Sequence, residues 1–519
     1  MKRVIVRKDS YYDSVFLMLI STDIKKIDGV EEAVVAMGTE MNVDLITEMG
    51  LGTDEVKAST PNDLIIAIDG SSEDTLDEAG AAVDKLLKQK KGTGDEAQYR
   101  PGSLASAVET VPEANLVIIS LPGQYAAREA RKALKNDLHV MLFSDNVSLE
   151  QEVELKKLAV EKGLLMMGPD CGTAIINGMP ICFSNVVPKG PIGIVSASGT
   201  GLQEVACTIA KAGGGVSQAL GTGGRDLKKA EVGGMMMKLC IEALGADQET
   251  KVITVISKPP LPELMKPVID TLKATGKPAV VHFVGEGAKE PDGSIQFAGS
   301  LEEAAKMAAA TITGETYEPR MFDANDAEID TTVERETAKM AAGQRYLRGL
   351  FTGGTLTDES ATLLYDALGG IFSFDASDPD FKLKDPHISQ GHTIVDLGED
   401  VFTVGRPHPM IDPSTRTERM EREAEDAEVA LWLLDCVIGY GSHADPAGAM
   451  LDQIKAAKAA AEKRGGYLSV VASVTGTDDD YQGLSSQRRK LEEAGVVVMP
   501  TNYQATMLVK RIMERRAAK

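Results

Sequence analysis

Two turns of small residues, each joining a predicted strand to a predicted helix, constrain the fold of this chain most. The first is GIVSASGTG (193–201), in which the strand ends at Val195 and the turn carries Ser196, Ser198, Gly199 and Thr200. The second is GLFTGGTLTDES (349–360), in which the strand ends at Phe351 and the turn consists of Thr352, Gly353, Gly354 and Thr355. A strand that runs directly into a helix is the repeating unit of parallel sheets, so the turns predict an α/β protein.

Both turns are also suited to binding an anion. Small residues let an anion approach the backbone, the N–H groups at a helix N-terminus point toward it, and the hydroxyl groups add donors. Either turn alone is also explained by steric demands, because many strand–helix crossovers are rich in glycine. Two turns of matching architecture in one chain favour a phosphate-binding role, and we predict that the eight turn residues hold phosphate.

The rest of the chain predicts a small N-terminal unit followed by three layered domains. At roughly 100–200 residues per domain, the 519 residues correspond to about three or four domains. Residues 1–95 alternate strands and helices in an order typical of a ferredoxin-like α+β domain, and the polar stretch 92–103 indicates a linker. Buried strands followed by helices then predict a Rossmann-like domain at 104–189 and flavodoxin-like parallel-sheet domains at 190–330 and 341–519.

Charge and cysteine content exclude several classes of function. The formal net charge is −23, whereas a non-specific nucleic-acid binder relies on clustered Lys and Arg, so we expect no nucleic-acid partner. The five Cys residues form no CxxC or CxxH pair, so neither a metal site nor a disulfide framework is expected. No segment approaches the roughly 20 apolar residues of a membrane helix, and we expect a cytoplasmic protein without membrane contact.

Two charged segments are further candidates for a site. GTGGRD (221–226) carries Arg225, which either helps to neutralise substrate charge or lies at a tight strand exit. GRPHPMIDPSTR (405–416) is stiffened by three prolines, and its Arg406 and Arg416 are suited to clamp a carboxylate. His408 in the same segment is able to transfer protons near neutral pH. The alternative is a structural loop whose charges pair with their neighbours.

Several segments resemble the succinyl-CoA synthetase superfamily. GPDCGTA (168–174), GIVSASGTG and GTGGRD are similar to turns of its α-subunit, and TGGT (352–355) and DLG (396–398) are similar to the carboxyl-terminal domain of its β-subunit. The resemblance implies a fusion of α-like and β-like parts, with a CoA-binding-type domain at 104–189. The same motifs, in one order with SKPP and TVGRPHPMIDP, identify the chain as a member of the FdrA family.

The chain departs from the synthetases where they carry phosphate. Their α-subunit has a phosphorylated histidine, and the matching loop SIQFAGS has Phe297 in its place. The glutamate that orients this histidine corresponds to Lys258 in ISKPP. The first 95 residues are also too few for an ATP-grasp portion. These departures imply that phosphate or an acyl phosphate is bound directly, as a substrate.

The FdrA resemblance implies an oxamate carbamoyltransferase-like activity that requires partner subunits, in purine and allantoin nitrogen catabolism. The reaction would be phosphorolysis of oxalurate to oxamate and carbamoyl phosphate, carried out on a small-molecule substrate and phosphate by an oligomeric assembly. Two alternatives stay open. One is a subunit of an acyl-CoA ligase that binds CoA as its cofactor, and the other is a non-catalytic scaffold or regulatory protein.

Overall fold

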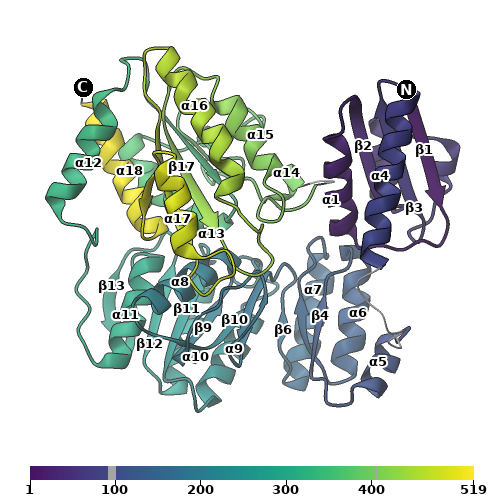
Figure 1. The fold of residues 1–519 in the computed structure, drawn as a ribbon. Helices are drawn as coiled ribbons and strands as arrows, with labels where there is room; N and C mark the ends of the chain where they lie inside the picture. The colour runs from purple at the N-terminus through teal and green to yellow at the C-terminus, as the bar shows by residue number, and fades with distance from the viewer. Residues whose placement is uncertain (92–100, 404–405, 519) are drawn as a thin grey trace. The chain divides into compact units, whose positions relative to one another are not determined.

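The computed structural model describes residues 1–91, 101–403 and 406–518, and it divides into two compact units (Figure 1). One unit comprises Met1–Arg100 together with Asp400–His408, and the other comprises Pro101–Glu399 and Pro409–Lys519. The mixed α/β architecture, with a small α+β unit at the N-terminus and parallel sheets after it, confirms the predicted fold class. Within the described residues, no helix combines the length and the apolar character needed to cross a membrane.

The small unit is a three-stranded antiparallel sheet with helices on both faces. Its strands lie in the order β1 (Lys2–Arg7), β3 (Leu64–Gly70), β2 (Val30–Met37). α1 (Ser14–Lys25) and α4 (Glu73–Lys91) pack on the face that carries Leu64, Ile66 and Ile68, whereas α2 (Glu40–Glu48) and α3 (Asp54–Lys57) cover Ile65 and Ala67. Because alternate side chains of a strand point to opposite faces, β3 is apolar throughout. The short helix α14 (Asp400–Thr403) also belongs to this unit.

A three-stranded parallel sheet opens the larger unit. Its strands lie in the order β4 (Leu116–Ile119), β5 (His139–Leu142), β6 (Met166–Met167). The helices of this layer are α5 (Leu104–Thr110), α6 (Gly123–Lys135) and α7 (Leu149–Lys162). α6 buries four alanines along one face, and their small side chains let the helix lie close to the sheet.

The second sheet of this unit has eight strands in the order β13-β14-β12-β11-β9-β10-β7-β8. The strands are β7 (Thr173–Ile176), β8 (Met179–Cys182), β9 (Lys189–Ser196), β10 (Val216–Gly221), β11 (Val252–Ser257), β12 (Ala279–Phe283), β13 (Lys289–Asp292) and β14 (Ile295–Phe297). The sequence prediction assigned residues 173–182 to the preceding domain, but β7 pairs with β10 and brings its hairpin partner β8 into this sheet. The helices are α8 (Gly199–Lys211), α9 (Met235–Ala246), α10 (Pro262–Thr275) and α11 (Leu301–Thr313).

The third sheet is parallel, with strand order β16-β15-β17-β18-β19. The strands are β15 (Tyr346–Phe351), β16 (Thr393–Asp396), β17 (Val429–Val437), β18 (Ser469–Thr475) and β19 (Val497–Met499). All nine residues of β17 are buried, as expected for a central strand covered on both faces. The helices are α12 (Asp326–Ala338), α13 (Gly354–Leu368), α15 (Ser414–Glu423), α16 (Leu451–Lys463), α17 (Leu484–Glu493) and α18 (Asn502–Ala517).

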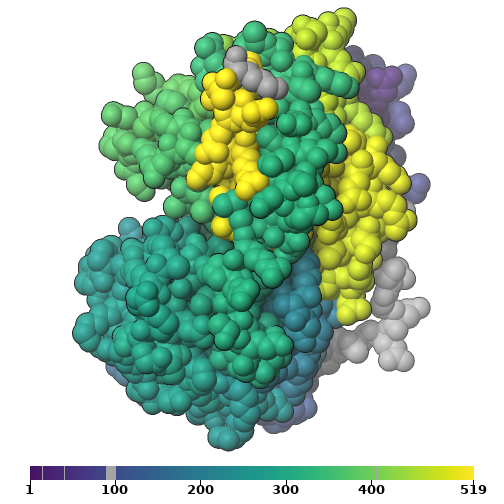
Figure 2. Space-filling model, turned by 90° about the vertical axis from the view of Figure 1, so that its left-hand side faces the viewer, coloured from purple at the N-terminus to yellow at the C-terminus, as the bar shows by residue number. Residues whose placement is uncertain are grey.

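Helices α8, α11, α13 and α18 contribute to one apolar core that joins the second and third sheets. Figure 2 shows α12, in green, beside the yellow α18, with which it is in contact. Because the two sheets share this core, the strand–helix turns of both sheets are held in fixed relative positions.

Buried glutamates of this core cap the N-termini of neighbouring helices. Glu359 on α13 accepts a hydrogen bond from Leu301 N, the first residue of α11, at 2.8 Å. Glu204 on α8 accepts one from Asn502 N, the first residue of α18, at 3.0 Å. A carboxylate satisfies the N–H groups that a helix leaves unpaired at its N-terminus, so these contacts fix the packing of the four helices.

The buried position of Glu359 makes the stability of this core depend on pH. Burial raises the pKa of Glu359 to about 7, so the folded protein holds a proton that the unfolded chain releases near pH 4.5. The free energy of unfolding should therefore fall as pH rises from about 4.5 to 7, and level off above that. Between pH 5 and pH 8, we expect the free energy of unfolding to fall by on the order of 1–3 kcal/mol less in Glu359→Gln than in the unaltered chain. Urea unfolding at the two pH values measures this difference. Equal slopes in the two proteins would contradict the assignment.

Candidate anion site at two helix N-termini

The N-termini of α8 and α13 lie in direct contact. Ser198, the N-cap of α8, shares a hydrogen bond between its Oγ and Oγ1 of Thr355 in the first turn of α13. A Cβ added to Gly353 would lie 2.8 Å from Cγ2 of Thr200, and one added to Gly201 would lie 3.0 Å from Cγ2 of Thr355. The two turns singled out from the sequence are thus brought together, and a side chain at either glycine would crowd a threonine of the other turn.

Several hydroxyl groups of the two turns are engaged by the protein itself. Ser196 Oγ donates to the carbonyl oxygen of Ser198 at 2.8 Å and accepts from its N–H at 3.1 Å. Ser198 Oγ accepts from Gly201 N at 3.0 Å and so caps α8. The residues that reach solvent are the exposed Gly199 and the partly exposed Thr200 and Gly354. An anion would therefore meet mainly the backbone N–H groups of the first helical turns, rather than the five hydroxyl side chains among the eight predicted residues.

Arg416 lies beneath the second turn, in a position that differs from the substrate clamp we predicted. Its side chain is only 4% exposed, and its guanidinium donates to the carbonyl oxygen of Leu350 and pairs with the carboxylate of Asp435. Asp435 in turn accepts from Thr352 N at 3.0 Å. Arg416 thus neutralises a buried carboxylate that positions the turn, because an unpaired charge at this depth would be costly.

Lys258 and Asp396 reach the same point from strands of two different sheets. A Cβ added to Gly354 would lie 2.6 Å from Nζ of Lys258 and 2.6 Å from Oδ2 of Asp396, so both charged groups lie at the start of α13. Lys258 also pairs with Asp358 at 3.5 Å. Sequence reasoning noted Lys258 only as a departure from the synthetases and missed Asp396 as a site residue, although DLG follows a strand as polar site residues often do.

Burial and neighbouring charges set the protonation of Lys258 and Asp396. Burial raises the pKa of Asp396 to about 7, and Lys258 partly opposes the shift. Burial alone would lower the pKa of Lys258, but Asp358 and Asp396 outweigh it and the pKa is raised above its ordinary value. Lys258 is therefore a cation at neutral pH, whereas Asp396 exchanges a proton there.

Arg225 contacts the protein rather than an open cavity. Its Nε pairs with the buried Glu152 at 2.7 Å and its Nη2 donates to the carbonyl oxygen of Val147 at 2.8 Å. Next to it, Lys156 is fully buried and bridges Glu152 at 2.9 Å and Asp226 at 2.8 Å. The prediction that Arg225 meets substrate charge is thus not supported by its contacts, which favour the alternative of a structured strand exit.

Arg406 and His408 belong to the other compact unit, with α14. Arg406 is exposed, and burial lowers the pKa of His408 to about 4. The His408 imidazole is therefore neutral at physiological pH, which makes it a weak base. Its role as a proton carrier, and the role of Arg406 as a carboxylate clamp, stay predictions.

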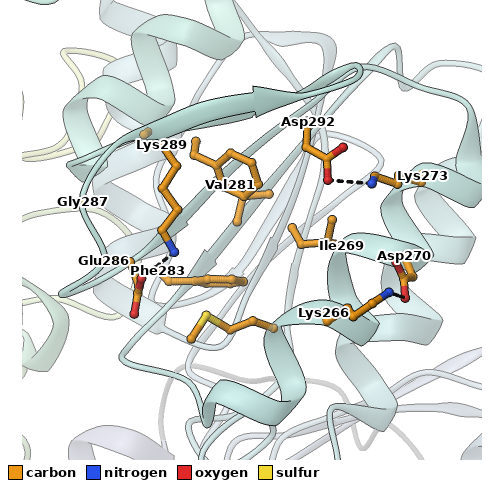
Figure 3. A pocket seen from close by; sticks show the side chains of 13 residues that line it. Lys266, Ile269, Asp270, Lys273, Val281, Phe283, Glu286, Gly287, Lys289 and Asp292 are labelled. Carbon is orange, nitrogen blue, oxygen red and sulfur yellow. Dashed lines mark hydrogen bonds and ion pairs between the residues drawn. The ribbon is translucent and has the colours of Figure 1, made fainter.

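Phe297 lies on β14, one strand in from the edge strand β13 of the eight-stranded sheet. It pairs with Val281, which pairs with Val255 and then Val195, so three strand spacings, about 14 Å, separate it from the first turn. It lines a cavity of about 350 Å³ whose interior carries Val281, Phe283 and Ile269. Figure 3 shows these apolar side chains between three ion pairs of the rim: Lys273–Asp292, Lys289–Glu286 and Lys266–Asp270.

One known protein resembles this chain over nearly its whole length. The identity is 45% over 513 residues with the uncharacterized protein YahF of Escherichia coli K12, and the match covers 98% of both chains. This chain belongs to the YahF family. Within this YahF-family chain, a family described as "AllF, heavy metal-associated domain" matches residues 1–101, and the CoA-ligase family matches residues 350–512.

More distant relatives support the superfamily predicted from the sequence. The α-subunit of succinate–CoA ligase from Staphylococcus aureus Mu50 is 25% identical over 236 residues, which cover 42% of this chain and 76% of that subunit. The acetyl-CoA synthetase 1 of Ca. Korarchaeum cryptofilum is 16% identical, with 82% of this chain and 88% of that chain covered and a TM-score of 0.30, which is too low to carry an argument. The YahF-family chain thus falls in the acyl-CoA synthetase and succinyl-CoA ligase superfamily.

The residues of the N-terminal unit do not fit a heavy-metal site. Soft metals prefer thiolate and imidazole ligands, and residues 1–101 contain neither Cys nor His. Across the described part of the chain, no group of three or more His, Cys, Asp or Glu side chains is arranged to hold a metal ion.

Proposed function

We propose that the chain is a subunit of a phosphate-using transferase built on a CoA-ligase framework. The observation that carries this proposal is the contact between the N-termini of α8 and α13, marked by the hydrogen bond between Ser198 and Thr355. Two helix N-termini add their partial positive charges at one point and offer backbone donors to a dianion. Phosphate bound there would be positioned to attack a carbonyl carbon, and the same donors would stabilise the charge that develops in the tetrahedral intermediate.

The resemblance to the FdrA family supports a carbamoyl group as the one transferred. In this proposal the substrate is oxalurate, the products are oxamate and carbamoyl phosphate, and the protein works in the cytoplasm with partner subunits in an oligomeric assembly. Phosphorus NMR of the purified chain with oxalurate and phosphate, alone and with partner subunits co-expressed, should show carbamoyl phosphate. Absence of the product in every combination would contradict the proposal.

An acyl-CoA ligase subunit is the second candidate, because the CoA-ligase family matches residues 350–512. This candidate requires CoA binding, whereas the phosphate transferase does not. Isothermal titration with CoA separates the two. A stoichiometric binding signal in the micromolar range would favour the ligase, and no binding at millimolar CoA would dismiss it.

Filling the first turn of α13 should weaken phosphate binding with little change of fold. The Cβ of Gly354→Ala would enter the space beside Lys258 Nζ and Asp396 Oδ2, both at 2.6 Å. We expect at least a tenfold loss of phosphate affinity by calorimetry, and a small change in melting temperature because alanine favours helix more than glycine does. Gly314→Ala is a matched control at a distant helix end, although its positive φ of 74° predicts a modest loss of stability. Unchanged phosphate affinity in Gly354→Ala would argue against phosphate at this turn.

A further inference from the structure

Two charged residues that end strands converge on the proposed phosphate site from opposite sheets. Lys258 directly follows β11, which lies beside β9 with Ile256 paired to Ser196. Asp396 is the last residue of β16, which lies beside β15 with Asp396 paired to Phe351. β9 and β15, which lead into the two turns, thus each have a neighbouring strand with a charged residue at its carboxyl end. Ligands of open α/β sheets bind at this edge.

The ammonium group of Lys258 lies at a helix N-terminus, where a cation is unfavourable unless an anion accompanies it. Its nearest ionic partner is Asp358, and the distance of 3.5 Å exceeds the about 2.7–2.9 Å usual for a charge-assisted hydrogen bond. Oδ2 of Asp358 is itself buried and has no hydrogen-bond partner among the described residues. The pair is therefore loosely engaged, and a dianion at the start of α13 would satisfy Lys258 better than Asp358 does.

We propose that Lys258 binds the phosphate of this site and that Asp396 carries the proton that the transfer moves. The inference rests on the proposed function and names the residues that would carry it out. Both groups lie within reach of one point beside the backbone of Gly354, so one bound oxyanion contacts both. Lys258 adds a full positive charge to the two helix ends, and Asp396 supplies a carboxyl group that exchanges a proton near neutral pH.

The proton step balances for transfer of a carbamoyl group from an amide to phosphate. An oxygen of hydrogen phosphate forms a bond to the carbamoyl carbon, the carbon–nitrogen bond breaks, and its electron pair goes to nitrogen. The protonated carboxyl group of Asp396 gives its proton to the leaving nitrogen, and the carboxylate that results takes up the proton of hydrogen phosphate. No oxidant, reductant or further reactant is needed.

Other charged groups act on the same pair and bear on its pH dependence. Glu399, Asp375 and Asp358 add negative potential at Lys258, and Glu399 and Asp435 act on Asp396. Lys228 lies near Lys258, and burial followed by repulsion from Lys258 lowers the pKa of its ammonium group. Binding of a dianion beside Asp396 should raise the affinity of its carboxylate for a proton, so binding near pH 7 should be accompanied by proton uptake.

Calorimetry of the full-length chain with sulfate tests both residues, because sulfate is a dianion that does not titrate at pH 7. Titrations in two buffers of different ionisation enthalpy give the affinity and the number of protons taken up. We expect Lys258→Met to lose at least tenfold in affinity for sulfate and phosphate, and Lys258→Arg to stay within about threefold of the unaltered chain. Lys266→Met, at an 80% exposed side chain paired with Asp270, is the matched control and should bind as the unaltered chain does.

The number of protons taken up on sulfate binding tests Asp396, because this number would stay the same in Asp396→Asn if Asp396 had only a structural role. We expect Asp396→Asn to bind sulfate at least as tightly as the unaltered chain, since a negative charge is removed, but without proton uptake. Equal affinity in Lys258→Met, or equal proton uptake in Asp396→Asn, would overturn the assignment while leaving the anion site intact. If the unaltered chain binds neither sulfate nor phosphate, the proposed function fails and the pair falls with it. Melting temperatures check that each variant is folded.

Discussion

Lys156→Met should destabilise the protein by about 3–5 kcal/mol, because it leaves the buried Asp226 without its cation and the buried Glu152 with Arg225 alone. Lys156, Glu152 and Asp226 are each fully buried, and the ammonium group also donates to the carbonyl oxygen of Thr222 at 3.0 Å. Asp226 further accepts from Met237 N at 2.7 Å and so holds the start of α9. Methionine matches the length of the lysine stem, so the change removes charge rather than volume. The measurement is urea unfolding at pH 7.

The neighbouring residue offers a close control for this prediction. Lys157 is exposed on the same helix, α7, so Lys157→Met should change the free energy of unfolding by less than about 0.5 kcal/mol. A loss below about 1 kcal/mol at pH 7 in Lys156→Met would mean that the cluster contributes little to stability.

The parts of the site that are local in sequence could be predicted from the sequence. The turns at 193–201 and 349–360 each lie within one strand–helix junction, so residue type and hydrophobic pattern were enough to find them. The fold class followed for the same reason, since buried strands alternating with helices have few other solutions. That the turns meet could be inferred only from the family resemblance, because the contact of Ser198 with Thr355 spans 157 residues.

The roles of individual charged residues could not be predicted, because they depend on partners far away in the chain. Arg225 and Arg416 both looked like substrate contacts, yet Arg225 pairs with Glu152 and Arg416 pairs with Asp435. A buried carboxylate requires a cation nearby, and the sequence does not reveal which carboxylates become buried. Asp396 was missed because nothing in its local sequence shows that Lys258, from the other sheet, lies beside it. The same limit applies to residues 173–182, whose hairpin joined the sheet that follows it.

Ser198→Asp should reduce phosphate affinity about a thousandfold and abolish any phosphate-dependent turnover. Two unit charges about 4 Å apart repel by about 4 kcal/mol at an effective dielectric constant near 20, and this energy corresponds to roughly three powers of ten in affinity. Aspartate is as good an N-cap as serine, so α8 should persist, and its carboxylate would occupy the positive helix end in place of phosphate. Ser198 is only 8% exposed, so solvent screens this charge weakly.

Ser198→Asn separates the charge of this substitution from its shape. Asparagine is nearly isosteric with aspartate and also caps helices, but it is neutral, so it should lose no more than about tenfold in phosphate affinity. Both variants disturb the contact with Thr355 to a similar extent, and the difference between them therefore reports on charge alone. Equal affinity in the two variants, measured by calorimetry with phosphate, would show that negative charge at this helix end is irrelevant. Phosphate would then have to bind elsewhere, because a dianion bound between these two helix N-termini should be repelled by the carboxylate of Ser198→Asp and not by the amide of Ser198→Asn.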